Sequence, residues 1–275
     1  MKVLVVIPKR YSMSPNAAWV GSPDMFSPTG MDVKVSVVFT WDKENAESIA
    51  EDWRAHGCKV EIGGPAYGDP GGEFCPNRFM ADGVVITHRG CVRNCPWCYV
   101  PKREGQKIRH LEIKDGNILQ DNNILACNND HRAKVYQMLR KQRRVSLRGG
   151  LDARLLRDSD IKEIRSLRLF DLWTAYDDKE NKTASVSAIG RLRDAGIPQS
   201  KIRCYVLIGF GNETRSEAEG RLRDCYQAGA YPFAQLYDGN SSQGEEHKEW
   251  KRLARRWSRP AIYKSFFKKD HNANT

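Results

Sequence analysis

The feature that most constrains the fold is a regular alternation of strand-like and helix-like segments beyond residue 107. Amphipathic stretches with apolar residues at helical spacing separate short apolar runs that are typical of buried strands. Those runs lie at 117–120, 144–150, 169–178, 201–210 and 231–239. Strands that alternate with amphipathic helices are typical of parallel βα units. The sequence therefore predicts an α/β fold with a parallel sheet.

Helix-capping residues indicate where several of the helices begin or end. Thr214 and Glu217 have the spacing of a capping box, and Gly229 follows at the expected end of that helix. Asp130 and Ser159 are the expected N-caps of two earlier helices, because their short side chains accept hydrogen bonds from the first turn.

The N-terminal part of the chain has a different pattern. The β-rich runs "KVLVVIP" and "VKVSVVFT" precede a helical segment around Trp53, and "CKVEIGG" follows as a third strand. A Gly- and Pro-rich stretch at 66–80 is the expected linker. We therefore expect a small Rossmann-like α/β unit at 1–80, a core of βα units at 81–240 and a basic helical tail at 241–275.

The chain is strongly basic. Its 45 Lys and Arg residues exceed its 34 Asp and Glu residues by 11. A net charge of this sign suits a nucleic acid or another anionic partner, and a basic surface without such a partner fits the same numbers. The basic residues are spread along the chain and include runs at 140–148 and 251–256.

Length and cysteine content limit the cellular setting. No apolar run approaches the roughly 18 residues of a membrane-spanning helix. The apolar stretch within "MKVLVVIPKR" is too short for a secretory signal, and no cleavage site of small residues follows it. Eight cysteines in 275 residues do not form a disulfide scaffold. These features predict a cytoplasmic protein without membrane segments.

Three of the cysteines are concentrated in the segment "GVVITHRGCVRNCPWCYVPKREG", residues 83–105. Cys91, Cys95 and Cys98 have the spacing C-x3-C-x2-C. The other five cysteines are scattered and fit small buried side chains. The uneven distribution indicates that these three thiols act together.

Three interpretations of this cysteine loop are open. A structural zinc site needs four nitrogen or sulfur ligands, and His88 can supply the fourth. The "CPWC" pair alone fits a dithiol redox centre, which leaves Cys91 without a role. Three thiolates also fit a 4Fe–4S cluster with one iron left open for a substrate or cofactor. The cations expected to keep the thiols deprotonated are Arg89, Arg93, Lys102 and Arg103.

The cysteine spacing, Trp97 before the last cysteine, the preceding strand and the downstream βα units together resemble the radical S-adenosylmethionine (radical SAM) enzymes. The phrases "QDNNILACNNDH", "RGGLDARLL" and "YVLIGFGNET" are similar to a group of bacterial and phage-type radical SAM proteins. The resemblance covers roughly residues 81–268. It implies a partial (β/α)6 TIM-like barrel, open on one side, with function at the carboxyl ends of its strands.

The resemblance also implies the cofactors. Cys91, Cys95 and Cys98 are expected to bind a 4Fe–4S cluster whose open iron binds S-adenosyl-L-methionine (SAM). An electron from an external donor of the flavodoxin or ferredoxin type then cleaves SAM to methionine and a 5′-deoxyadenosyl radical, which abstracts hydrogen from the substrate. The residues that act on the substrate, the reaction type and the oligomeric state are not implied.

The same resemblance places candidate SAM contacts at the ends of the expected strands. The family's Gly-Gly-Glu segment is absent, and polar residues at 121–123 stand in its place, where an Asx-rich turn is an equally good explanation. The stretch 206–210 resembles the adenine-contacting segment, where Gly209 and Gly211 fit the need for small residues, with an ordinary strand-to-helix turn as the alternative. Asp152 or Arg154 after the third strand suits the ribose hydroxyls or the carboxylate. Asp177 after the fourth strand is a similar candidate, with helix capping as its alternative. The full set of candidate cofactor-binding residues is Trp97, Asp121, Asn122, Asn123, Asp152, Arg154, Asp177, Gly209 and Gly211.

The sequence thus predicts a radical SAM enzyme whose substrate is unidentified, with the positive charge favouring a nucleic acid or another anionic molecule. Some related enzymes carry a cobalamin domain before the barrel. The cobalamin motif Asp-x-His-x-x-Gly is absent here, and His56 is the only histidine of the N-terminal part, so we expect no cobalamin. The alternative function is a nucleic-acid-binding or redox protein in which the three cysteines hold a structural metal.

Overall fold

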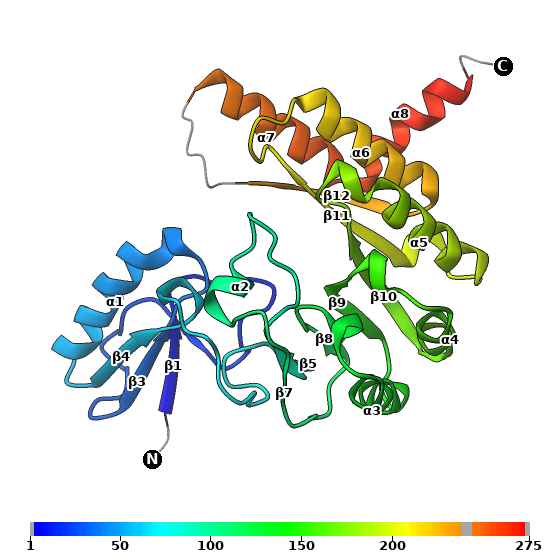
Figure 1. Cartoon of the computed structure of the whole chain (residues 1–275). Helices are drawn as coiled ribbons and strands as arrows, with labels where there is room; N and C mark the ends of the chain where they lie inside the picture. The colour runs from blue at the N-terminus through cyan, green and yellow to red at the C-terminus, as the bar shows by residue number, and fades with distance from the viewer. Residues whose placement is uncertain (1–2, 238–243, 273–275) are drawn as a thin grey trace. The chain divides into compact units, whose positions relative to one another are not determined.

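A computed structural model describes residues 3–237 and 244–272 as an α/β protein with parallel sheets (Figure 1). One sheet has four strands in the order β2-β1-β3-β4, and another has six in the order β12-β11-β10-β9-β8-β5. The α/β class expected from the sequence is therefore confirmed. The chain divides into two compact units, residues 1–119 (unit 1) and 120–275 (unit 2). The expected boundary near residue 80 lies inside unit 1, and the three-part division stays a prediction.

Unit 1 contains the four-stranded sheet, a short antiparallel pair β6–β7 and the strands β5 and β8. Its strands are β1 Val3–Ile7, β2 Trp19–Val20, β3 Asp32–Ser36, β4 Lys59–Gly63, β5 Val84–Val85, β6 His88–Arg89, β7 Arg109–His110 and β8 Ile118–Leu119. Its helices are α1 Lys43–Ala55 and α2 Val100–Arg103, with 3-10 turns η1 Thr40–Asp42 and η2 Pro65–Tyr67.

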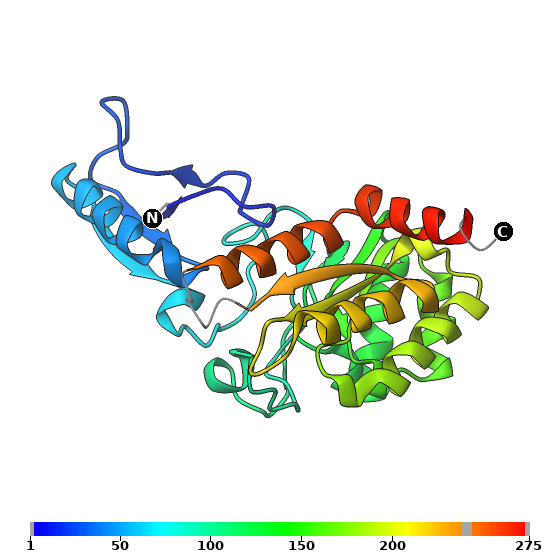
Figure 2. The same ribbon diagram turned by 90° about the horizontal axis from the view of Figure 1, so that it is seen from above.

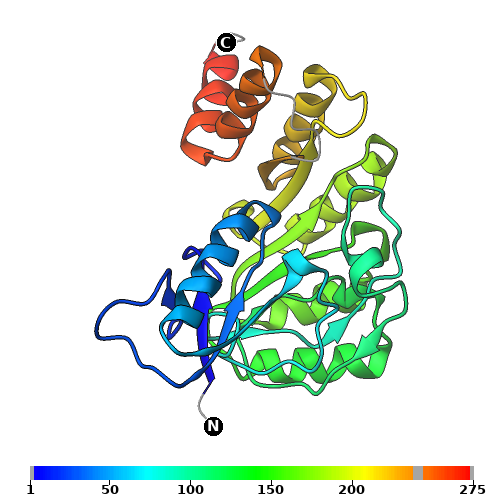
Figure 3. The ribbon, with the colours of Figure 1, turned by 90° about the vertical axis from the view of Figure 1, so that its left-hand side faces the viewer.

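The expected strand–helix–strand element of the N-terminal part is present as β3, α1 and β4. β3 and β4 are parallel, with Val33 opposite Val60 and Val35 opposite Ile62. The helix α1 lies on one face of this sheet (Figure 3) and buries Trp53 in the small core. Alternating valines on β3 and an apolar stripe on α1 explain why these two elements pack together.

Unit 2 alternates helices with parallel strands. Its strands are β9 Val145–Leu151, β10 Leu169–Ala175, β11 Ile202–Ile208 and β12 Tyr231–Leu236. Its helices are α3 Asn129–Arg140, α4 Asp158–Ser166, α5 Lys182–Asp194, α6 Arg215–Ala228, α7 Glu245–Trp257 and α8 Pro260–Asn272. The 3-10 turns are η3 Ile124–Ala126, η4 Ala153–Leu155, η5 Lys179–Asn181 and η6 Gln199–Lys201. The strands expected between residues 144 and 237 are confirmed, whereas residues 238 and 239 lie outside the described residues.

The predicted boundaries of α6 are confirmed. The Thr214 hydroxyl accepts a hydrogen bond from the Glu217 N–H at 3.3 Å, and the Glu217 carboxylate accepts one from the Thr214 N–H at 2.9 Å. Gly229 closes the helix with a φ of 103°, which is strained for any residue with a side chain.

The predicted N-caps of α3 and α4 are wrong. Asn128 caps α3, because its side-chain oxygen accepts a hydrogen bond from the His131 N–H at 2.9 Å; Asp130 lies in the first turn. The helix α4 starts after Arg157, whose N–H donates to the Asp160 carboxylate at 3.1 Å. Ser159 therefore lies inside this helix.

The C-terminal helices cover one end of unit 2. Figure 2 shows α7 running alongside β12, the strand that it contacts most. The basic tail expected from the sequence thus contains two helices, which bury Trp250, Leu253, Trp257 and Tyr263. In the described part of the chain, no helix is both long and apolar enough to cross a bilayer.

Candidate functional site

The cysteine loop of unit 1 is a long excursion between β6 and β7. These two strands are antiparallel, with His88 opposite His110. None of the eight cysteines, all of which lie in the described part of the chain, forms a disulfide bond. Trp97 is half-buried within the loop. The three loop thiols lie shortly before α2 and are partly exposed: Cys91, Cys95 and Cys98.

A buried carboxylate, that of Glu104, fastens the cysteine loop at its base. It accepts a hydrogen bond from the Gly90 N–H at 3.1 Å and lies 3.6 Å from the Arg89 guanidinium. The Arg103 guanidinium pairs with the same carboxylate. Gly90 has a φ of 81°, and a Cβ there would overlap the Lys107 carbonyl oxygen, so this position requires glycine. Two of the cations expected to favour thiolates therefore share one buried counter-charge.

The sulfur atoms of the three loop cysteines lie farther apart than the ligand atoms of a single metal ion. The Cys98 N–H donates to the Cys95 carbonyl oxygen at 3.0 Å, which forms a turn between these two residues. Among the described residues of unit 1, no three Cys, His, Asp or Glu side chains bring their ligand atoms within 4.8 Å of one another. Sulfur ligands of one tetrahedral zinc lie about 4 Å apart. The thiolates of a 4Fe–4S cluster bind different irons and are spread more widely.

Unit 2 carries most of its polar candidate residues where its parallel strands end. Asp152 and Arg154 follow β9, Asp177 follows β10, and Gly209 and Gly211 follow β11. β9, β10 and β11 are neighbours in the sheet, and parallel strands place their carboxyl ends on one edge. The structure therefore brings these five predicted residues to the same edge, which we call the carboxyl edge.

Asp152 is the centre of a hydrogen-bond network on the carboxyl edge. Its carboxylate accepts from the Arg154 Nε at 2.7 Å and from the Asn123 side-chain amide at 3.3 Å. The Arg154 guanidinium also reaches the Asn181 side-chain oxygen, 3.4 Å away. The Asp152 side chain is 6% exposed and that of Arg154 is 36% exposed. The Arg154 guanidinium is thus partly exposed to solvent, and the less exposed Asp152 carboxylate fixes its position through hydrogen bonds.

The segment 121–123 lies directly against β9. Asp121 and Asn123 are buried and Asn122 is half-buried. At Gly149 of β9, a Cβ would overlap the carbonyl oxygen of Asp121 and lie 2.5 Å from its carbonyl carbon. Only glycine allows this approach of the two backbones.

A buried arginine, Arg221 of α6, ties together the ends of β10 and β11. Its guanidinium donates to the carbonyl oxygens of Tyr176 at 2.9 Å and Leu207 at 2.8 Å. It also pairs with the Glu213 carboxylate, which in turn accepts from the Gly209 N–H at 3.1 Å. The Gly209 N–H is therefore engaged within the protein, and a Cβ at this glycine would lie 3.2 Å from the Leu236 side chain and 3.5 Å from that of Trp250.

Sequence reasoning missed three residues of this edge, Asn181, Glu213 and Arg221. A signal existed for Arg221, because it shares the buried face of α6 with Ala218 and Leu222. A charged residue at such a position needs buried partners. Asn181 and Glu213 lie in turns and carry no such signal.

Asp177 lies on the carboxyl edge in a half-buried position. Its carboxylate accepts a hydrogen bond from the Leu207 N–H at 2.8 Å. Burial raises the pKa of this carboxyl above its ordinary value, against the opposing effects of that hydrogen bond and of Arg221 and Arg154. Folding therefore favours the protonated carboxyl, and an ionised Asp177 costs stability at neutral pH.

We expect the free energy of unfolding of Asp177→Asn, measured relative to that of the wild type, to increase as the pH rises. The unfolded carboxyl ionises near pH 3.9 and the folded one at higher pH, so wild-type stability falls across that interval. Asparagine keeps an oxygen for the Leu207 N–H and carries no charge. Urea unfolding of both proteins at about pH 4 and about pH 7 measures the difference.

The matched control is Asp158→Asn, for which the opposite sign is expected. Asp158 is exposed, and a hydrogen bond from Arg191 lowers the pKa of its carboxyl. That contribution is present above the unfolded pKa and is lost at low pH, so Asp158→Asn should lose stability relative to the wild type as the pH rises. Equal pH trends for the two variants would contradict the role given to burial at Asp177.

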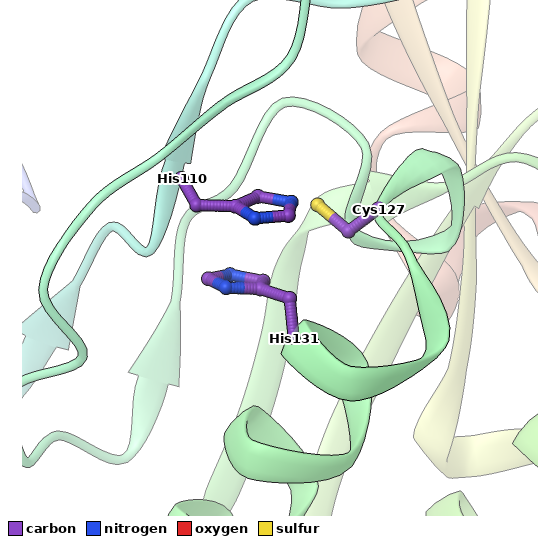
Figure 4. Close-up of side chains that lie close together, drawn as sticks. All are labelled: His110, Cys127 and His131. Carbon is purple, nitrogen blue, oxygen red and sulfur yellow. The ribbon is translucent and has the colours of Figure 1, made fainter.

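Cys127 and His131 lie close together at the start of α3 (Figure 4). Both are buried, and the Cys127 sulfur lies within 4.8 Å of a ring nitrogen of His131. Burial and the Asp121 charge raise the pKa of the Cys127 thiol to about 12, against the effect of Arg132. No third ligand group of the described part of unit 2 joins this pair, and a metal ion needs more donors than two. The other residue labelled in Figure 4, His110, belongs to unit 1.

The candidate residues thus fall into two sets, one in each unit. Unit 1 holds Trp97 and the three thiols of the cysteine loop, and unit 2 holds the polar residues and glycines of the carboxyl edge with the segment 121–123. In comparisons with known proteins, the chain matches no protein-family model and has no significant match among curated proteins.

Proposed function

We propose that this protein is a radical SAM enzyme that binds a 4Fe–4S cluster through Cys91, Cys95 and Cys98. The observation that carries the proposal is the C-x3-C-x2-C spacing on one anchored loop with partly exposed thiols. Cysteine thiolates are the usual protein ligands of iron–sulfur clusters. The loop thus has a suitable donor set, and three thiolates leave one iron for another ligand.

The cluster and SAM together supply a one-electron cleavage of a C–S bond, which yields methionine and a 5′-deoxyadenosyl radical that takes hydrogen from the substrate. The protein's own residues have supporting roles. Glu104 holds the base of the loop through Gly90 and Arg89. Trp97, between two of the cysteines, is a half-buried ring that limits access of water to the loop.

The carboxyl edge of unit 2 supports the proposal as a place for SAM. Asp121, Asn122 and Asn123 supply acceptors for an ammonium group. Arg154, held by Asp152, suits a carboxylate. At Gly211 no atom lies within 4 Å of the place of a Cβ, which leaves room for a flat base, whereas at Gly209 that place is 3.2 Å from the Leu236 side chain. Asp177 is half-buried at this edge, and its carboxylate accepts a hydrogen bond from the Leu207 N–H of β11.

The strand order of the six-stranded sheet also supports the proposal. Its strands follow one another in sequence order from β8 to β12, as in a βα barrel. We therefore propose that the sheet is the wall of a partial (β/α)6 barrel. The reaction needs an external one-electron donor of the flavodoxin or ferredoxin type, and the net charge of +11 favours an anionic substrate.

Anaerobic reconstitution with iron and sulfide tests the cluster. We expect about four irons per chain and a broad absorbance near ~400 nm. The triple variant Cys91→Ala, Cys95→Ala, Cys98→Ala should lose both signals. Cys75→Ala is the matched control, because Cys75 is an exposed thiol of the same unit outside the loop and should leave both unchanged.

Reduction of the reconstituted protein with dithionite in the presence of SAM tests the chemistry. The expected product is 5′-deoxyadenosine, formed by the wild type and Cys75→Ala and absent from the triple variant. If the protein binds a cluster but forms no 5′-deoxyadenosine, the proposed enzyme activity is contradicted and a redox protein is the remaining interpretation. A protein that binds only zinc at the loop would support the alternative, a structural metal in a nucleic-acid-binding protein.

A further inference from the structure

A second feature of unit 2 lies at the edge of its sheet where the strands begin. β9 starts at Val145, β10 at Leu169 and β11 at Ile202. Residues just before these strands line an open hollow of about 620 Å³. Parallel strands begin on the edge opposite their carboxyl ends, so this hollow is separate from the candidate SAM contacts of unit 2. We call it the basic hollow.

The basic hollow is lined by four cations and no acidic residue. The cations are Arg143, Arg144, Arg168 and Lys201. Among the described residues, no carboxylate forms an ion pair with Arg143, Arg168 or Lys201. Arg143, Arg168 and Lys201 repel one another electrostatically, and a bound polyanion would relieve this repulsion. The basic run expected from the sequence at 140–148 thus contributes to a concave surface.

An aromatic ring lies among these cations. Phe170 is 46% exposed, so its ring is accessible from solvent. The Arg144 guanidinium lies over this ring, 4.5 Å from its centroid. Leu167 and Leu169 provide the apolar remainder of the lining.

The backbone at Arg144 also indicates a use for its side chain. Arg144 has a φ of 55°, a left-handed conformation that glycine or asparagine adopts at less cost. Such strain costs about 1–2 kcal/mol for a residue with a Cβ. Folding alone therefore favours another residue at this turn, whereas arginine supplies a planar cation beside Phe170.

We propose that the basic hollow binds a single strand of nucleic acid. The cations bind backbone phosphates, and Phe170 with the Arg144 guanidinium offers flat surfaces on which bases stack. Stacking surfaces accept every base, because each base has a flat face, so we expect binding that tolerates sequence. The cations come from three separate segments of an open surface, which suits a chain of phosphates better than one small anion.

Fluorescence anisotropy of the full-length protein with labelled oligonucleotides of about ten nucleotides, oligo-dT and oligo-U, tests this proposal. The triple variant Arg143→Gln, Arg168→Gln, Lys201→Gln should raise Kd more than tenfold at about 0.1 M salt. It should also lessen the slope of log K against log salt by about 2, because each phosphate contact of a single strand contributes about 0.7. Phe170→Leu should raise Kd roughly tenfold and leave the slope unchanged, because it removes stacking and no charge.

The matched control is a triple variant of α7, Lys248→Gln, Lys251→Gln, Arg255→Gln, which removes the same charge from another surface of unit 2. It should change Kd less than twofold. Circular dichroism checks that each variant is folded. No cluster or SAM is needed, so the result is independent of the proposed enzyme activity.

Three outcomes would overturn the proposal. The first is a wild type that binds neither oligonucleotide, and the second is an α7 variant that binds as weakly as the basic-hollow variant. The third is that duplex DNA or inorganic polyphosphate competes as well as the unlabelled single strand. Phosphate charge alone would then explain binding, and unpaired bases would make no contribution.

Discussion

Replacing Arg221 with methionine should lower the free energy of unfolding by about 3–5 kcal/mol. The Arg221 side chain is 6% exposed and donates to two backbone carbonyl oxygens, those of Tyr176 and Leu207, while it pairs with Glu213. Methionine has a similar length, but it leaves both oxygens without this donor and the Glu213 carboxylate without its cation. Urea unfolding followed by circular dichroism measures the loss.

The same substitution two residues further along α6 is the control. Arg223 is 44% exposed and pairs with Glu219 at 3.3 Å, an i,i+4 surface pair. Arg223→Met should therefore cost less than about 1 kcal/mol. Adding Glu213→Gln to Arg221→Met should recover part of the loss, because it removes the unpaired charge. A loss no greater for Arg221→Met than for Arg223→Met would show that this network does not stabilise the fold.

The strands and helices of unit 2 were predictable because their signals are local. A strand such as β11 is a continuous apolar run, and α6 begins with a capping box whose two residues lie three apart. Capping residues that stand close together are harder to rank. Asn128 and Asp130 both suit an N-cap, and only the backbone at Asn128, with a ψ of 165°, places its oxygen near a free helix N–H.

The sequence allowed single candidate residues of the carboxyl edge to be named, but not the contacts between them. Asp152, Asp177 and Gly209 follow strands, and a parallel sheet places such residues on one edge. The partners of these residues lie far along the chain, as Leu207 does from Asp177 and Asn123 from Asp152. Such pairs depend on which strands are neighbours, and no local pattern carries that information.

Gly149→Ala is expected to lower the free energy of unfolding by about 3 kcal/mol, because the new Cβ overlaps the backbone of Asp121. A flexible side chain turns away from such an overlap, but a carbonyl group moves only with its chain segment. Either β9 or the segment 121–123 must shift. Urea unfolding measures the cost, and the Asp121 and Asn123 amide signals in an NMR spectrum report the movement.

Gly220→Ala is the control, because it adds the same methyl group where no atom lies within 4 Å. Gly220 is an exposed position inside α6, so alanine there should raise the free energy of unfolding by about 0.5–1 kcal/mol. The two glycine variants should therefore change stability in opposite directions. A neutral Gly149→Ala would mean that 121–123 is free to move away from β9, which would count against the proposed role of this segment in holding the ammonium group of SAM. A large cost would instead support 121–123 as a preorganised part of the carboxyl edge.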